Sequence, residues 1–226
     1  MKLLKRTDYL LKMIDGIIFD LDGTLWNSTG ATYLIWNEAF ERNGIPYRMT
    51  YEKALHFMGM TMHTIKAELE ETGYADDAER IVSVMSSSSS EYKFTDEHGN
   101  PKGVVLYDGC LDTLRRLSKR YKLFIVSNCG SGYIESFMET FNIASLFADI
   151  ECFGRTGLSK ADNIRLVVER NGLESAVYVG DTAGDERSAH SAGIPFIYAN
   201  YGLGEAFCPD HIIYSLCDLI PLCSSL

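Results

Sequence analysis

Residues 17–24, Ile17-Ile18-Phe19-Asp20-Leu21-Asp22-Gly23-Thr24, decide the fold of this chain. The apolar run 17–21 predicts a short buried strand, and Gly23-Thr24 predict the turn that ends it. Because ligands in an open α/β sheet bind beyond the carboxyl ends of the strands, Asp20 and Asp22 would be held side by side there. Two close carboxylates repel each other unless a cation or a shared proton lies between them, so the pair indicates a divalent metal site. Taken alone, an Asp-x-Asp is more often an acidic turn without a function.

Strand and helix patterns alternate in the second half of the chain. Buried strand patterns occur at residues 122–127 (KLFIVS), 148–152, 176–180 (AVYVG), 195–199 and 211–214, and helical patterns at 111–117, 133–141, 161–170 and 186–192. This alternation predicts an α/β fold, a Rossmann-like parallel sheet with helices on both faces. Gly202-x-Gly204 lacks the third glycine and the following helix of a dinucleotide-binding loop, so no such loop is predicted.

Residues 26–95 have a helical character instead. Apolar residues recur at helical spacing, glycines at positions 44, 59 and 73 separate the segments, and no convincing strand is found. We therefore expect a separate helical domain at 26–95, inserted into a core domain made of residues 13–25 and 96–226. Residues 1–12 form an N-terminal extension. The serine run 86–90 is expected on a polar helix face rather than as a linker or phosphorylation site.

The composition restricts the kinds of partner that we expect for this protein. The net charge of −10 over 226 residues argues against a nucleic-acid partner but allows a small phosphorylated one. The six cysteines include no C-x-x-C pair, which favours reduced thiols and a cytoplasmic location. No apolar run reaches the length of a membrane span, so no membrane partner is expected. We expect a monomer or a homodimer.

Polar groups follow further strand ends, where chemistry would need them. Ser127 and Asn128 end one strand pattern, Lys160 opens a helix, and Asp181 and Asp185 follow another strand. A hydroxyl and a backbone N–H can hold phosphate oxygens, and a lysine can neutralise a transferring phosphoryl group. Asp181 and Asp185 are hard oxygen ligands of the kind that Mg²⁺ prefers. Each residue alone could be a turn, a surface lysine or a helix cap, but their common placement argues against coincidence.

These motifs resemble those of the haloacid dehalogenase (HAD) superfamily of phosphohydrolases. The four motifs are Asp20-Leu21-Asp22-Gly23-Thr24, Ser127, Lys160 and Gly180-Asp181-x-x-x-Asp185. The resemblance covers the chain from about residue 13 onward, and the helical insertion looks like the C1-type cap of the phosphoglycolate phosphatase-like and β-phosphoglucomutase-like branch. It implies a HAD-like core with a helical cap, and a Mg²⁺-dependent phosphatase that acts on a small phosphorylated metabolite.

The resemblance also implies roles for the motif residues. Asp20 would attack phosphorus and form an aspartyl-phosphate, and Asp22 would protonate the leaving alcohol and then activate water. Mg²⁺ would be held by Asp20, the Asp22 carbonyl and Asp181, with Asp185 as a ligand or a neighbour of one. Ser127 and the Asn128 backbone would hold the transferring oxygens, Lys160 would balance their charge, and Thr24 would fix the turn.

Other members of the superfamily remain alternatives. A true dehalogenase does not use a second acid at the position of Asp22, so Asp22 favours phosphoryl transfer. A phosphonate hydrolase would want a Schiff-base lysine, for which the cap offers Lys53, Lys66 and Lys93, but the second aspartate of the first motif argues against that interpretation. A non-catalytic binding protein is disfavoured by the intact acidic motifs. A phosphosugar mutase of the β-phosphoglucomutase type and an inorganic pyrophosphatase stay open.

The sequence says less about the substrate than about the type of reaction. We expect a closed cap to admit small phosphoesters rather than phosphoproteins. The cap residues His56, Thr61, His63 and Lys66 are candidate contacts of the leaving group, or ordinary polar surface. Mutases of this branch carry a histidine where this chain has Thr32, so we expect hydrolysis rather than isomerisation.

Overall fold

A six-stranded parallel sheet forms the centre of the molecule. The computed structural model describes residues 14–91 and 93–226, so the predicted extension at 1–12 lies outside the described residues. The sheet has the order β5-β4-β1-β6-β7-β8, and every neighbouring pair of its strands is parallel. Its strands are β1 (Gly16–Phe19), β4 (Lys122–Ser127), β5 (Asp149–Cys152), β6 (Ala176–Gly180), β7 (Phe196–Ala199) and β8 (His211–Ile213). The predicted parallel α/β sheet is confirmed.

The strand order identifies one position at the edge of the sheet where a ligand-binding site is expected. The chain runs outward from β1 through β4 to β5, and then continues on the other side of β1 with β6, β7 and β8. The direction of winding therefore reverses between β1 and β6. In doubly wound sheets, ligands bind in the crevice outside the carboxyl ends of the strands at this reversal. Asp20 directly follows β1 and Asp181 directly follows β6.

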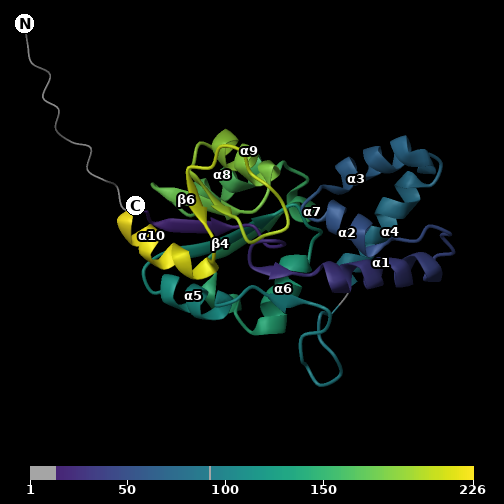
Figure 1. Cartoon of the computed structure of the whole chain (residues 1–226), viewed down its shortest axis with the longest axis horizontal. Helices are drawn as coiled ribbons and strands as arrows, with labels where there is room; N and C mark the ends of the chain where they lie inside the picture. The colour runs from purple at the N-terminus through teal and green to yellow at the C-terminus, as the bar shows by residue number, and fades with distance from the viewer. Residues whose placement is uncertain (1–13, 92) are drawn as a thin grey trace, which may run out of the picture.

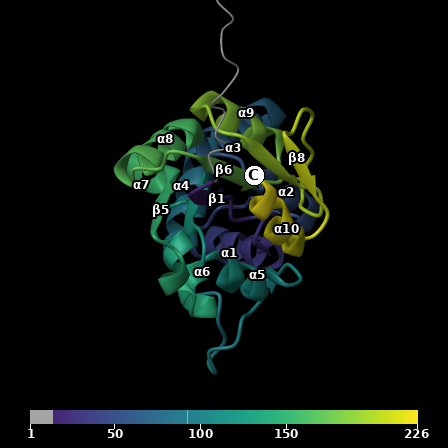
Figure 2. The same ribbon diagram turned by 90° about the vertical axis from the view of Figure 1, so that its left-hand side faces the viewer.

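Helices cover both faces of the sheet (Figures 1 and 2). Successive strand residues point to opposite faces, so Ile17 and Phe19 join one hydrophobic cluster and Ile18 joins another. The first cluster includes α5 (Cys110–Leu117), α6 (Tyr133–Phe141) and α10 (Leu219–Ser225). The second includes α8 (Lys160–Arg170) and α9 (Ala183–Ala192). Because both faces are buried, the strands read as continuous apolar runs, as seen in KLFIVS and AVYVG.

The first four helices of the described chain, which follow β1, form a bundle beside the sheet (Figure 1). They are α1 (Thr29–Arg42), α2 (Tyr51–Phe57), α3 (Met62–Leu69) and α4 (Ala78–Glu91), with a π-helical turn η1 (Glu70–Tyr74) after α3. The bundle has a hydrophobic cluster of its own, built around residues such as Phe40, Phe57 and Ile65. The serine run 86–90 lies in α4. The helix breaks predicted at glycines 44, 59 and 73 separate α1 from α2, α2 from α3 and α3 from α4.

Short elements that the sequence pattern did not predict connect the two parts. Trp26–Asn27 forms strand β2, which pairs antiparallel with β3 (Val105–Leu106), so residues on both sides of the bundle meet in one ribbon. Trp26 is fully buried in the cluster below the sheet, with Phe94 and Phe137 in edge-to-face contact. A two-residue strand is too short to give an alternating pattern, which is why residues 26–95 looked wholly helical.

The remaining helices are short. They are α7 (Phe153–Thr156) and the 3₁₀ turns η2 (Ala144–Leu146) and η3 (Leu216–Asp218). Over residues 14–91 and 93–226, no helix is both long and apolar enough to cross a membrane. All six cysteines lie in the described part of the chain and are free thiols, as predicted.

Candidate active site

Three buried aspartates meet at the carboxyl ends of β1 and β6. Asp20, Asp181 and Asp185 each offer a carboxylate oxygen, and these oxygens lie within 4.8 Å of one another. Asp20 is 1% exposed, and Asp181 and Asp185 are fully buried. The sheet topology therefore brings together acidic residues that lie about 160 positions apart in the sequence.

Lys160 is the cation that contacts this cluster. Its Nζ donates to Asp20 Oδ1 at 2.9 Å and to Asp185 Oδ1 at 2.6 Å. The residue opens α8, which begins at the Ser159 N-cap, whose hydroxyl accepts from the backbone N–H of Asp162. Burial alone would lower the pKa of Lys160, but the charges of Asp185 and Asp20 raise it. Lys160 is therefore held charged between two of the three carboxylates.

Asp185 organises the loop that carries Asp181. Its Oδ2 accepts from the backbone N–H of Asp181 at 3.2 Å, from that of Thr182 at 3.0 Å and from Thr182 Oγ1 at 2.7 Å. Thr182 and Asp185 form the capping box of α9. The helix begins at Ala183 rather than at residue 186, because this cap adds a turn before the predicted start. One carboxylate oxygen of Asp185 thus binds the loop, and the other binds Lys160.

Asp181 is fixed by a loop that the sequence did not point to. Its Oδ2 accepts from the backbone N–H of Leu203 at 2.8 Å and of Gly204 at 3.2 Å, and Thr24 Oγ1 lies 3.4 Å from its Oδ1. A side chain at Gly202 would clash with Asp181, and one at Gly23 would clash with its carboxylate. Gly23 and Gly202 therefore leave room for the Asp181 side chain. A side chain at Gly204 would crowd Thr182 and the backbone oxygen of Asp181, which accounts for the second glycine of the Gly202-x-Gly204 pair.

The cluster fits a hard divalent cation. Three carboxylates face one lysine, so the charge is unbalanced, and carboxylate oxygens are the ligands that Mg²⁺ takes in proteins. Burial raises the pKa of Asp20 to about 6 against the lowering effect of Lys160. Burial and the charge of Asp185 raise the pKa of Asp181 well above its usual value. A bound cation would relieve both penalties.

We expect Mg²⁺ to stabilise the protein through this cluster. A cation at about 100 times its dissociation constant adds about 2.7 kcal/mol, which corresponds to a rise in melting temperature of about 5–10 °C for a chain of this size. Asp181→Asn should lose most of the rise, while Asp162→Asn, which changes an exposed aspartate on α8, should keep it. Thermal melts with and without Mg²⁺ measure both. Equal shifts in the two variants would show that Mg²⁺ binds elsewhere.

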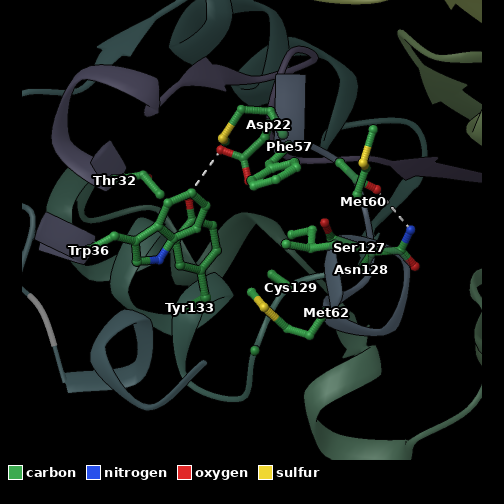
Figure 3. A pocket seen from close by; sticks show the side chains of 14 residues that line it. Asp22, Thr32, Trp36, Phe57, Met60, Met62, Ser127, Asn128, Cys129 and Tyr133 are labelled. Atoms are coloured by element: carbon green, nitrogen blue, oxygen red, sulfur yellow. Dashed lines mark hydrogen bonds between the residues drawn. The ribbon is translucent and has the colours of Figure 1, made fainter. Parts of the chain in front are cut away.

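Asp22 follows Asp20 by two residues, but its carboxylate binds two hydroxyl groups outside the aspartate cluster. Its Oδ1 accepts from Tyr133 OH at 3.0 Å (Figure 3). The same oxygen accepts from Ser28 Oγ at 2.6 Å, and the two hydroxyls are 2.7 Å apart. Burial raises the pKa of Asp22 to about 7, although the Ser28 hydrogen bond opposes the rise. A carboxyl group with a pKa near neutrality can both donate and accept a proton.

The hydroxyl partners of Asp22 were not among the predicted site residues. Ser28 precedes α1 and could have been found as a helix-start signal six residues after Asp22. Tyr133 is the first residue of α6 and lies more than 100 positions away, so no local pattern reveals it. Thr32 Oγ1 donates to Ser28 Oγ at 3.3 Å, which extends the network into the helical bundle.

Ser127 and Asn128 lie at the carboxyl end of β4, next to β1. Ser127 is buried. The Asn128 side chain donates from Nδ2 to the backbone oxygen of Gly59 at 3.0 Å, in the link between α2 and α3. Asn128 thus connects the sheet to the helical bundle in this arrangement.

A cavity of about 50 Å³ lies between the bundle and the sheet. Asp22, Ser127 and Tyr133 line its sheet side, and residues of α1, α2 and α3 line the bundle side (Figure 3). None of the four candidate cap contacts, His56, Thr61, His63 and Lys66, lines this cavity, while His56 and Thr61 line a neighbouring pocket. His56 pairs with Glu68 at 2.8 Å and Lys66 with Glu79 at 2.8 Å, on the outer side of the helices.

Known proteins are similar to this chain in sequence and in fold. The family model of haloacid dehalogenase-like hydrolases matches residues 17–199. The phosphoglycolate phosphatase of Escherichia coli O157:H7 is 27% identical over 92% of each chain, and that of Cereibacter sphaeroides is 26% identical over 91% of this chain and 95% of the relative. A haloacid dehalogenase-like hydrolase from Streptococcus pneumoniae superposes with a TM-score of 0.77 at 23% identity, covering 93% of this chain and 98% of the other.

Proposed function

The chain belongs to the haloacid dehalogenase-like hydrolases, and we propose that it is a Mg²⁺-dependent phosphatase that hydrolyses a small phosphomonoester through an aspartyl-phosphate. One observation carries the proposal. Asp20, the first residue after β1, lies with Asp181 and Asp185 in a buried carboxylate cluster beside Lys160. Asp22, two residues on, is held apart from the cluster by Ser28 and Tyr133. The site thus separates a nucleophile from an acid–base group.

The two aspartates have different tasks in the proposed reaction. Asp20 Oδ attacks phosphorus and displaces the alcohol, whose oxygen takes the proton of Asp22. Asp22, now ionised, accepts a proton from water, which attacks the phosphorus of the aspartyl-phosphate and releases inorganic phosphate. Ser127 and the Asn128 backbone donate to the transferring oxygens, and Lys160 balances their charge.

We propose that Asp20, Asp181 and the Asp22 carbonyl hold Mg²⁺, with Asp185 supporting the site through Lys160 and the Asp181 loop. Mg²⁺ would reduce the repulsion between the anionic nucleophile and the anionic phosphate. Thr24 supports Asp181 from the turn after β1, at a distance of 3.4 Å.

We also propose the domain division that goes with this activity. Residues 26–95 would be a cap that closes over a core domain of 13–25 and 96–226. The separate hydrophobic cluster of α1–α4 supports it, as does the hydrogen bond from Asn128 to Gly59 in the link between α2 and α3, which a moving cap could break and reform. We expect a monomer or homodimer with a cytoplasmic location.

Hydrolysis is favoured over sugar isomerisation. Thr32 occupies the position at which related mutases carry a histidine, and its hydroxyl reaches Asp22 only through Ser28.

The activity is tested with p-nitrophenyl phosphate. The purified protein should release p-nitrophenolate with Mg²⁺ present, lose this activity with EDTA and regain it when Mg²⁺ is restored in excess. A folded protein that shows no metal-dependent release of phosphate from this ester or from a panel of phosphorylated metabolites would contradict the proposal.

A further inference from the structure

The cavity beside Asp22 has a chemical character that the phosphatase proposal does not use. We propose that the substrate is a monoester of a small, uncharged alcohol with an apolar body, and that phosphoglycolate is a poor substrate. The inference rests on the proposed function, because it assumes that a phosphoryl group is transferred at Asp20.

The position of Asp22 decides where the leaving alcohol must lie. A general acid has to be within hydrogen-bond reach of the atom that it protonates. Asp22 and Ser127 both line the cavity of about 50 Å³ between the bundle and the sheet. An ester whose phosphoryl group sits at Asp20 and Ser127, and whose bridging oxygen meets Asp22, therefore extends its alcohol part into this cavity.

The bundle side of the cavity is mostly apolar. Thr32 and Gly59 contribute to its wall, and the other bundle residues that line it are Trp36, Phe57, Met58, Met60, Met62 and Ile65. Figure 3 shows the Trp36 and Phe57 rings and the Met60 and Met62 side chains around the space in front of Asp22. Methionine side chains are flexible and polarisable, so such a wall adapts to apolar groups of different shape. The wall offers contact area rather than charge recognition.

The described residues that line this cavity include no lysine, arginine or histidine. The basic side chains of His56 and Arg187 line a different pocket. This wider pocket has a volume of about 710 Å³, and neither Asp22 nor Ser127 lines it. Met58, Gly59, Met60 and Asn128 line both pockets, and the hydrogen bond from Asn128 to Gly59 ties them together at the boundary. Arg187 thus lines the wider pocket and is not among the residues that line the cavity beside Asp22.

An anionic leaving group is therefore disfavoured. A carboxylate in this cavity would lose its hydration against apolar side chains and would face the acidic side chain of Asp22 without a cation to pair with. Phosphoglycolate carries such a carboxylate next to the bridging oxygen. The size of the cavity is a further restriction, because about 50 Å³ is only a few times the roughly 10–15 Å³ that one water needs.

A matched pair of esters tests the inference. Phosphoglycolate and its amide, carbamoylmethyl phosphate, have the same size and differ in the charge of the leaving group. We expect kcat/KM with Mg²⁺ to be about 100-fold higher for the amide, since a buried unpaired charge is costly. Ethyl phosphate should also exceed phosphoglycolate. A ratio of amide to acid below tenfold would overturn the inference while leaving a working phosphatase. No hydrolysis of these esters or of p-nitrophenyl phosphate would instead overturn the proposed function, and the inference with it.

A charge placed in the wall gives a second, independent measurement. Met60→Lys should raise kcat/KM for phosphoglycolate by about tenfold and lower it for ethyl phosphate, because the new cation pairs with the carboxylate. Met60→Gln is the matched control, which is polar and uncharged and should give no gain with phosphoglycolate. If the two variants change the two substrates alike, residue 60 does not face the leaving group and the assignment of the cavity is wrong. Thermal melts establish that both variants are folded.

Discussion

The Asp20→Asn variant is expected to lose phosphatase activity by about 10⁴-fold or more while remaining folded. The amide cannot attack phosphorus, so the aspartyl-phosphate cannot form and both chemical steps are lost. The substitution keeps the shape of a side chain that is 1% exposed. It also removes one of three carboxylates around a single lysine, and burial already raises the pKa of Asp20 to about 6, so the neutral residue should not lower the melting temperature of the metal-free protein.

The comparison for Asp20→Asn is Asp162→Asn. Asp162 is an exposed aspartate on α8, paired with Arg165 at 2.5 Å, and its loss should leave turnover unchanged. Steady-state release of phosphate from ethyl phosphate and p-nitrophenyl phosphate, together with circular dichroism melts, distinguishes loss of chemistry from loss of fold. A folded Asp20→Asn protein that retains a tenth of the wild-type activity would exclude Asp20 as the nucleophile.

The sheet and its polar strand ends could be predicted because their signals are local. KLFIVS and AVYVG are buried on both faces, so their apolar runs alone mark them as strands of a parallel sheet. Asp20, Ser127 and Asp181 follow directly at strand ends, and a parallel sheet brings all such ends to one edge. Lys160 could be placed there because it opens a helix after Gly157-Leu158-Ser159.

The residues that hold these side chains in place could not be predicted in the same way. Leu203 and Gly204 fix Asp181 with backbone N–H groups, and a backbone N–H leaves no signature in the sequence. The glycines at 202 and 204 leave space for Asp181 and Thr182, but a Gly-x-Gly pair alone does not indicate that role. Tyr133 reaches Asp22 only because α6 starts above the end of β4. Both contacts depend on the packing of elements that are distant in the sequence.

For the cap, the sequence left two interpretations open. His56 and Lys66, near the helix break at Gly59, could contact the leaving group or form ordinary polar surface. In an amphipathic helix, however, the polar side faces solvent and the apolar side faces the neighbouring element. His56 and Lys66 accordingly pair with glutamates of the bundle, and Phe57 and Ile65 face the cavity.

The Asp22→Asn variant should separate the two halves of the reaction. With ethyl phosphate, whose alkoxide leaves poorly without a proton, kcat should fall by about 10³–10⁴-fold. With p-nitrophenyl phosphate, whose phenolate leaves without help, formation of the aspartyl-phosphate should continue. Its hydrolysis should then stall, because no group accepts a proton from the attacking water. Rapid mixing should show a burst of about one p-nitrophenolate per enzyme, followed by slow turnover.

The contacts of Asp22 allow this substitution to test its chemical role without disturbing the fold. Both Ser28 Oγ and Tyr133 OH approach the same oxygen, Oδ1, so an asparagine can keep these contacts with its carbonyl oxygen. Burial raises the pKa of Asp22 to about 7, so the neutral amide resembles the protonated form that the buried site tolerates. The variant should therefore fold and bind Mg²⁺ like the wild type, as thermal melts can show.

Equal losses for the two esters without a burst would mean that Asp22 does not act as the acid and base. The proton would then have to come from another group at the cavity, of which Tyr133, whose pKa is raised well above its usual value by burial and by the charge of Asp22, would be the nearest.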